Sequence, residues 1–490
     1  MKAATAGARG FSRSTIELVF MGPYANVTRV LARLALALSD WAERWVPDAF
    51  IFALVATILV ALAALAATPA SLPQVVDAWG RGFWDLIPFT LQMSLIIMTG
   101  HVLASSPPMQ RAIRVIASWP RTPKSAVALV TFFSLATSWF NWGFSLIFAA
   151  MLALEVERHV DGVDRRALAA ASFLGAGSIW AQGLSGSAAL MMATPGALQP
   201  QIRDIVAHGG LVPGGLIPFG HTIFLWQSFA SVGIEIVVVT TVMWFATPAE
   251  LGPQNVERRT GNSDQTNPES RPTTPGQYLE HSSILMWLTV GLGVWYLVRY
   301  FAAAPDPLNA ITLNTLNLAF LLLGFLLHRT TARLMAAFRA ATPAVWGVIL
   351  QFPFYAGIAG IIIATHLSDR IAAAFVHVST RGTFPPLVAI YSAVLGVFVP
   401  SGGSKWVVIA PYVMEAAHTM HVHLGWCVSA YDLGEAVANL IQPFFMLPIL
   451  GLFGLQARDV MGYTIVVFLV LTPVVIALVW LFGLTLSYPM

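Results

Sequence analysis

The chain has 490 residues, of which 57% are hydrophobic and only 10% are charged, so it carries too little polar surface to cover a soluble globule of its size. Its formal net charge of +3 does not indicate a nucleic-acid partner, because membrane proteins collect Lys and Arg in their cytoplasmic loops for topological reasons. The single cysteine, Cys427, excludes an intramolecular disulfide and a cysteine metal cluster. The composition predicts an all-α polytopic membrane protein whose helices span about 30 Å of hydrocarbon.

The polar parts of the chain lie at its N-terminus and near its middle. Residues 1–48 are expected in the cytoplasm, with residues 24–47 forming an interfacial amphipathic helix on the membrane surface. The stretch 247–282 is rich in Pro, Asn, Ser and charged residues and predicts a cytoplasmic linker. Apolar segments suited to one crossing each lie at residues 49–68, 84–105, 167–194, 224–246, 283–303, 309–328, 344–365, 425–453 and 462–486.

Two further apolar segments, 125–158 and 384–416, are too long for one simple crossing. Each has a polar break in its middle, SWFNWGFS around Asn141 and FVPSGGSKW around Ser401, so each can fold as a re-entrant hairpin that enters and leaves on the same side. If both are hairpins and the N-terminus is cytoplasmic, most of the 26 Lys and Arg residues fall on the inner side, as the positive-inside rule requires. The sequence predicts about nine full crossings and two re-entrant hairpins.

The two breaks belong to an internal repeat. Matching residues recur at an offset of 259 or 260, as in Leu91 with Leu350, Asn141 with Ser401, and Gln182 with Gln442. The first copy would cover residues 49–246 and the second 309–486, with 283–303 as a connecting transmembrane helix. Four crossings and the connecting helix make an odd number, so the second copy must be inverted. Inverted repeats with broken helices are typical of secondary transporters that work by alternating access.

Polar groups near the middle of a membrane are costly unless they are paired or hydrated, so clusters of them indicate a function. Gly and Pro loosen the helices at the breaks, and the freed amides and half-helix N-termini can hold a small anion such as a carboxylate. Glu435 is the candidate coupling group, four residues before Asn439 on the same helical face. The candidate substrate-binding residues lie at the hairpin tips and in the two broken helices that follow them: Asn141, Gly143, Ser145, Gln182, Ser185, Ser187, Ser401, Gly402, Ser404, Lys405 and Asn439.

Simpler interpretations stay open for several of these residues. Ser185 and Ser187 can serve close helix packing, and Lys405 can extend to the outer surface from a shallow loop. Glu435 is either a structural partner of Lys405 or a proton carrier. The sequence contains no enzyme motif, no metal-ligand cluster and no pair of carboxylates other than surface groups.

A series of ordered motifs resembles the bacterial short-chain fatty acid transporter family, which is grouped with the ion-transporter superfamily. The motifs include NWGFSLIFAAMLALEVERHV, GLSGSAALMMATPG, VPSGGSKWVV and GEAVANLIQPFFMLP, and the resemblance covers nearly everything from residue 40 onward. It implies a homodimer in the bacterial cytoplasmic membrane, with a fixed scaffold and a moving transport domain. Where the family pattern has Gly and His after PSGG, this chain has Ser404 and Lys405, which puts inherited proton coupling at that position in doubt.

We therefore expect a secondary active transporter that carries short-chain fatty acids or other small monocarboxylates, such as acetoacetate or butyrate, by elevator-type alternating access. No cofactor is expected other than a coupling H⁺ or Na⁺, and the expected partners are the carboxylate, membrane lipid and a second copy of the chain. The alternatives are a cation/proton antiporter or another organic-anion carrier on the same scaffold. The sequence does not determine which acid is carried or which ion drives it.

Overall fold

The computed structural model describes residues 49–247, 274, 278, 281–308, 310–398, 402–442, 444–455 and 457–490. The expected amphipathic helix at 24–47, nearly all of the linker 247–282, and Ser401 lie outside these residues. Within them the secondary structure is helical throughout, with no strand.

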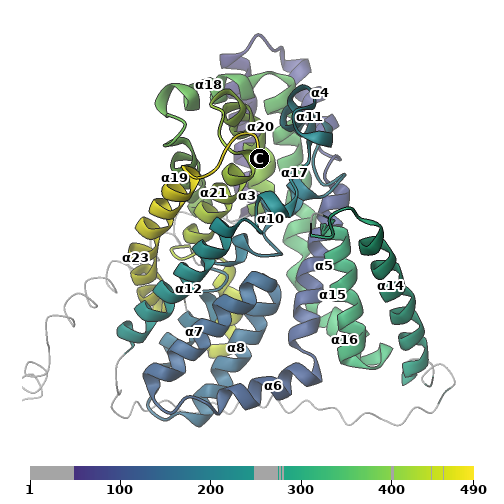
Figure 1. Ribbon diagram of the computed structural model, residues 1–490, viewed down its shortest axis with the longest axis vertical. Helices are drawn as coiled ribbons and strands as arrows, with labels where there is room; N and C mark the ends of the chain where they lie inside the picture. The colour runs from purple at the N-terminus through teal and green to yellow at the C-terminus, as the bar shows by residue number, and fades with distance from the viewer. Residues whose placement is uncertain are drawn as a thin grey trace, which may run out of the picture.

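Apolar helices occupy seven of the nine segments that the sequence assigns to single crossings. Five helices in the described part of the chain are long and apolar enough to cross a membrane: α5 (Ile87–Ala104), α12 (Trp226–Ala246), α14 (Ser283–Ala303), α17 (Trp346–Ala364) and α23 (Ala457–Gly483). Two more segments are filled by α3 (Ala49–Ala67), whose apolar stretch is Ala53–Ala67, and by the shorter apolar helix α15 (Leu313–His328). The connecting helix α14 lies at the edge of the molecule and packs against α15 (Figure 1).

Four short helices that the sequence analysis did not predict lie between the spans: α4 (Leu72–Gly82), α6 (Pro107–Ala117), α16 (Thr331–Ala341) and α18 (Leu367–Val378). The first begins at Ser71, whose backbone N–H donates to Gln74 Oε1 at 2.8 Å in a capping box. In α6 only Ile113 and Ala117 are buried, so one face of this helix packs while the rest is exposed or half-buried. Such helices were missed because each is too short and too polar to resemble a span.

Both long segments are divided at their predicted breaks. The first forms α7 (Pro123–Phe140) and α8 (Trp142–His159), which pack against each other on either side of Asn141. The second forms α19 (Phe384–Phe398) and α20 (Gly402–Thr419). These two arms touch little, because α19 packs mainly against α21 (Leu424–Ala438) and α20 mainly against α17 and α18.

The segments 167–194 and 425–453, which the sequence assigns to the two broken helices, are interrupted. The first consists of α9 (Arg165–Phe173), a turn, the 3-10 helix η1 (Trp180–Gln182) and α10 (Ser187–Ala193). The second consists of α21, a turn, η6 (Phe444–Met446) and α22 (Leu447–Phe453). Every residue of α21 is buried, so this helix lies in the interior of the protein. The remaining helices are α11 (Pro200–Ala207), η2 (His208–Gly210), η3 (Pro213–Gly215), η4 (Phe219–His221) and η5 (Thr342–Ala344).

Helices recur along the chain at the offset of the sequence repeat. α5 begins at Ile87 and α17 at Trp346, 259 residues later, and α10 and α22 begin 260 residues apart. The packing partners are exchanged between the halves: α5 packs against α15 and α16, whereas α17 packs against α3 and α4. Equivalent short helices lie at opposite ends of the long axis, with α4 and α18 at one end and α6 and α16 at the other (Figure 1).

Paired glycines show why some residues match between the halves. A Cβ on Gly175 would overlap the carbonyl oxygen of Ser134 on α7, and a Cβ on Gly434 would overlap that of Ala389 on α19. Each broken helix therefore approaches the preceding arm at a glycine.

Candidate functional site

Asn141 forms the first break. It ends α7 and is the N-cap of α8, where its Oδ1 accepts the backbone N–H of Phe144 at 2.8 Å. Its Nδ2 donates to the carbonyl oxygen of Ile96 on α5 at 3.4 Å, and the side chain is fully buried. Asn141 thus holds the helix break together with its own hydrogen bonds.

The neighbouring candidates of the first tip also serve the break. Ser145 Oγ donates to the carbonyl oxygen of Ser134 at 2.7 Å, and Ser185 Oγ accepts the backbone N–H of Trp142 at 2.9 Å. Gly143 is buried where a Cβ would lie 3.3 Å from the carbonyl oxygen of Ile97 on α5. Ser185 thus satisfies a backbone N–H at the break, as a break inside a membrane requires, whereas Ser145 and Gly143 hold the start of α8 close to α7 and α5.

Lys405 and Glu435 form a buried ion pair between α20 and α21. Their side chains are 3% and 0% exposed, so Lys405 does not extend to the surface. The Lys405 ammonium also donates to the carbonyl oxygen of Ser392 at 2.8 Å and lies 5.5 Å from the centre of the Tyr431 ring. The Oε1 atom of Glu435 has no hydrogen-bond partner among the described residues.

The second tip packs on the first broken helix. A Cβ on Gly402 would lie 2.8 Å from the Trp180 ring, and a Cβ on Gly403 would lie 3.2 Å from Cβ of Ser187. Gly402 also accepts the Tyr431 hydroxyl through its carbonyl oxygen at 2.5 Å. Ser404 lies in the first turn of α20, and Ser401 lies just outside the described residues.

Asn439 joins the two broken helices. Its Nδ2 donates to the carbonyl oxygen of Ala176 at 3.1 Å, and its Oδ1 accepts from Nε2 of Gln442 at 2.8 Å. Because Ala176 belongs to the first half and Asn439 to the second, the two repeats meet here as well as at the second tip.

Trp180 lies between the two tips and was not predicted. Its ring centre is 6.3 Å from that of Trp142, the first residue of α8, and it packs against Ala436 in a small apolar cluster. The indole N–H groups of both tryptophans are buried and have no acceptor among the described residues. This region therefore holds the Lys405–Glu435 ion pair, an apolar wall and two indole N–H groups that have no acceptor in the described part of the chain.

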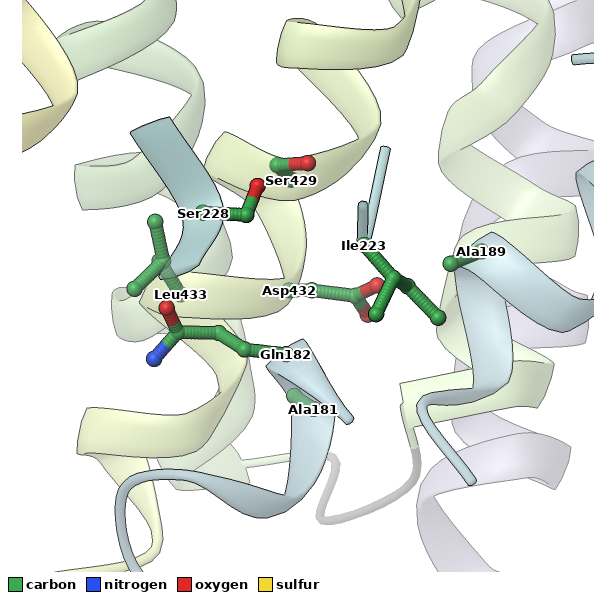
Figure 2. A pocket seen from close by; sticks show the side chains of 8 residues that line it. All are labelled: Ala181, Gln182, Ala189, Ile223, Ser228, Ser429, Asp432 and Leu433. Carbon is green, nitrogen blue, oxygen red and sulfur yellow. The ribbon is translucent and has the colours of Figure 1, made fainter. Parts of the chain in front are cut away.

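A small cavity lies beside this region, lined by Ala181, Gln182, Ala189, Ile223, Ser228, Ser429, Asp432 and Leu433 (Figure 2). About 10 Å³ of it is accessible to the centre of a water-sized sphere, room for about one water molecule. A larger groove of about 390 Å³ between α18 and α20 is lined in part by the carboxylates of Asp369 and Glu415, which do not suit an anion.

Two buried carboxylates, on α21 and α12, were not among the residues that the sequence analysis singled out. Asp432 on α21 is 1% exposed and faces the backbone N–H groups of Ala188 and Ala189. Glu235 on α12 is fully buried, and its Oε1 accepts from Nε2 of Gln182 at 2.8 Å. The signal in the sequence was an acidic residue in the middle of an apolar segment.

The profile of the family described as short chain fatty acid transporter matches residues 30–482, which is most of the chain. The chain belongs to the short-chain fatty acid transporter family. The resemblance found in the motifs is confirmed, and since this is a family of transporters, so is the expectation that the protein is not an enzyme.

Two proteins similar to this chain carry the provisional name short-chain fatty acid transporter. The protein from Escherichia coli strain K12 is 38% identical over 438 residues, covering 89% of this chain and 96% of its own length. The protein from Haemophilus influenzae is 33% identical over 449 residues, covering 91% of this chain and 99% of its own length.

Solved structures place the family member in an all-helical membrane transporter fold. The Alcanivorax borkumensis YdaH transporter, of unusual topology, matches with a TM-score of 0.58 at 13% identity, covering 91% of this chain and all of its own. MtrF of Neisseria gonorrhoeae, of a class of antimetabolite efflux pumps, matches with a TM-score of 0.54 at 14% identity, covering 93% and 99%. Because these identities are low, the structural likeness shows only the fold, which is that of a multi-pass membrane protein.

Proposed function

We propose that this member of the family is a secondary active transporter that carries a short-chain fatty acid or similar small monocarboxylate across the cytoplasmic membrane. The observation that carries the proposal is the buried Lys405–Glu435 pair of the second half, which lies beside Gly402, the residue that packs on Trp180 of the first half. A buried ammonium is a strong counter-charge for a carboxylate. The provisional names of the relatives agree with this cargo.

The chemistry around the pair suits a small acid with a short alkyl chain. The carboxylate would take the place of Glu435 beside Lys405 and accept the free indole N–H of Trp180 or Trp142. The backbone N–H groups at the start of α20, in Gly402 and Ser404, would add positive potential. The alkyl chain would pack on the cluster of Trp142, Trp180 and Ala436.

Competition for Lys405 links anion binding to proton binding. Glu435 loses its partner when the substrate carboxylate takes Lys405, and an unpaired charge in a low-dielectric interior is strongly unfavourable. Protonation of Glu435 removes that charge, so one proton enters with one anion. Neither the anion alone nor the proton alone binds well, because each leaves one uncompensated charge. Glu435 is therefore the coupling group of this mechanism.

The remaining candidates support this site instead of touching the anion. Asn141, Gly143, Ser145 and Ser185 shape the first break and so position Trp142. The contacts of Asn439 and Ser187 hold the broken helices against the other half.

The transporter works by alternating access of the elevator type, with residues 49–246 and 309–486 as inverted repeats and the hairpins 125–158 and 384–416 as re-entrant. Two observations support the inverted repeat. Equivalent short helices, such as α4 and α16, lie at opposite ends of the molecule, and the packing partners of α5 and α17 are exchanged between the halves. The chain has about nine crossings with a cytoplasmic N-terminus, and it forms a homodimer surrounded by lipid.

The test is counterflow by purified protein in liposomes. Labelled butyrate and acetoacetate are offered against a panel of unlabelled acids, with H⁺ and Na⁺ gradients imposed separately and protein-free vesicles giving the passive flux. We expect saturable exchange that a proton gradient drives. The double variant Lys405→Gln, Glu435→Gln should lose it, whereas Lys124→Gln at the half-buried start of α7 should keep it. Equal activity in the double variant, or no exchange of any carboxylate, would contradict the proposal.

A cation/proton antiporter is the second candidate, favoured by the buried carboxylates Glu235 and Asp432. It predicts proton efflux in exchange for Na⁺ with no carboxylate present. The proposal above predicts no such flux.

A further inference from the structure

Glu235 is a buried acid that the mechanism above does not use. It is the tenth residue of the 21-residue helix α12, so it lies at the middle of an apolar span. Its side chain is fully buried. Oε1 accepts from Gln182 Nε2 at 2.8 Å and from Ser231 Oγ at 2.9 Å, while Oε2 has no hydrogen-bond partner among the described residues.

The charges buried around the site do not balance. Apart from Asp164, which pairs with Arg166 at the start of α9, the described residues bury three carboxylates and a single ammonium. The ammonium of Lys405 balances Glu435, and Asp432 receives the backbone N–H groups of Ala188 and Ala189. Glu235 has two neutral donors and no cation. An ionised carboxylate there would be strongly unfavourable, so it needs a proton.

Among the described residues, no other charged group supplies that compensation. Glu235 lies on a helix that packs against α7 and α23. The ionisable residues of α7 and α23 lie within the first two turns of those helices, namely Lys124, Arg458, Asp459 and Tyr463. The ionisable residues of α21 are Cys427, Tyr431, Asp432 and Glu435. Within the described part of the chain, the side chains that act on the Glu235 carboxylate are those of Gln182 and Ser231.

Gln182 connects Glu235 with the site. It belongs to η1, two residues after Trp180, and it lines the small cavity, as Asp432 does (Figure 2). Gln182 Oε1 and Asp432 Oδ1 are both buried without a partner among the described residues. The side chain of Gln182 alone thus separates the water-sized cavity from Glu235. Gln182 belongs to the same broken helix as Trp180.

We propose that Glu235 binds a second proton in each transport cycle, in addition to the proton taken by Glu435. This inference rests on the proposed carboxylate transport and deepens it. Two protons and one monocarboxylate carry a net positive charge inward, so transport responds to the membrane potential as well as to the pH gradient. With Glu435 alone, the same cycle would be electroneutral.

The decisive variant is Glu235→Gln, which keeps an oxygen for the Gln182 and Ser231 hydrogen bonds and mimics the protonated acid. Proton and butyrate fluxes are measured together in liposomes, with a potassium diffusion potential imposed by valinomycin. We expect the ratio to fall from about two protons per acid to about one, and the response to potential to be lost. Counterflow at equal pH should stay within about twofold of wild type, because that exchange needs no net proton movement. The control Glu415→Gln, at the half-buried end of α20, should behave as wild type.

An unchanged proton ratio in Glu235→Gln would overturn the proposal. A second readout needs no substrate: infrared spectra of the purified protein should show a carbonyl band of a protonated carboxyl that titrates with pH and disappears in Glu235→Gln but persists in Glu415→Gln. A band that is absent, or that is independent of pH across the working range, would also overturn it. If wild type exchanges no short-chain acid but the band titrates, the proposed substrate fails and proton binding by Glu235 stands.

Discussion

The ammonium of Lys405 and the carboxylate of Glu435 pair with each other in the interior of the protein, where the side chain of neither residue is more than 3% exposed. Removing one partner leaves a buried charge alone, which typically costs about 3–5 kcal/mol. Lys405→Met and Glu435→Gln should therefore each lower the stability of the purified protein by that order. The double variant Lys405→Met, Glu435→Met should recover most of the loss, because it leaves no charge to compensate. Thermal unfolding in detergent measures this, and a double variant less stable than both single variants would refute it.

The free indole N–H of Trp180 gives a second prediction. Trp180→Phe keeps an aromatic ring beside Gly402 but removes the donor. A hydrogen bond to a charged group contributes about 1.5–3 kcal/mol, so the half-saturating butyrate concentration should rise about 10-fold or more. Stability should change little, because the N–H has no acceptor among the described residues. Trp119→Phe, at an exposed position, is the matched control. Unchanged affinity in Trp180→Phe would remove this donor from the site.

The hydrogen bonds of Asn141 predict a structural effect on transport. Asn141→Ala removes the cap of α8 and should cost about 1–2 kcal/mol of stability and reduce butyrate uptake. Asn141→Ser retains an acceptor for the N–H of Phe144 and should restore most of both. Melting temperature and vesicle uptake are measured on the same preparations. If Ala and Ser variants are equally inactive but fully stable, Asn141 contacts the substrate instead.

His423 predicts acid sensitivity. It precedes α21, where its Nδ1 accepts the backbone N–H of Trp426 at 3.0 Å, and burial, followed by the charge of nearby His221, lowers its pKa from 6.5 to about 4. Because the unfolded chain binds this proton more tightly, stability is retained above about pH 6.5 and is lost as the pH falls toward about 4, by up to about 3 kcal/mol. His423→Asn caps the helix without titrating and should flatten this part of the stability profile. The same pH slope in both proteins would contradict the assignment.

The sequence predicted the breaks well because breaks leave local signals. Asn141 and the glycines after Ser401 interrupt long apolar segments, and the helices end within one residue of Asn141. The repeat was detectable for a similar reason: Gly175 and Gly434 match because at both positions a Cβ would collide with a neighbouring backbone.

Apart from the pairing of Lys405 with Glu435, side-chain partnerships could not be predicted, because they join residues far apart in the chain. Gln182 and Glu235 are 53 residues apart, and Ala176 and Asn439 are 263 apart. A single carboxylate such as Glu235 carries no sequence signal of its partner. Likewise, the sequence left open whether Lys405 faces the interior, since its orientation depends on how α20 packs against α17, α18 and α21.

The most direct test of the account is the number of protons taken up when the purified protein binds butyrate in detergent, measured by titration calorimetry in buffers of different ionisation enthalpy. The proposed coupling through Lys405 and Glu435 predicts uptake of at least about one proton per acid. The affinity should weaken as the pH rises, because the anion pairs with Lys405 only when Glu435 is protonated. The double variant Lys405→Gln, Glu435→Gln should bind no butyrate. Binding without proton uptake and with the same affinity at every pH would contradict the coupling of anion binding to the protonation of Glu435.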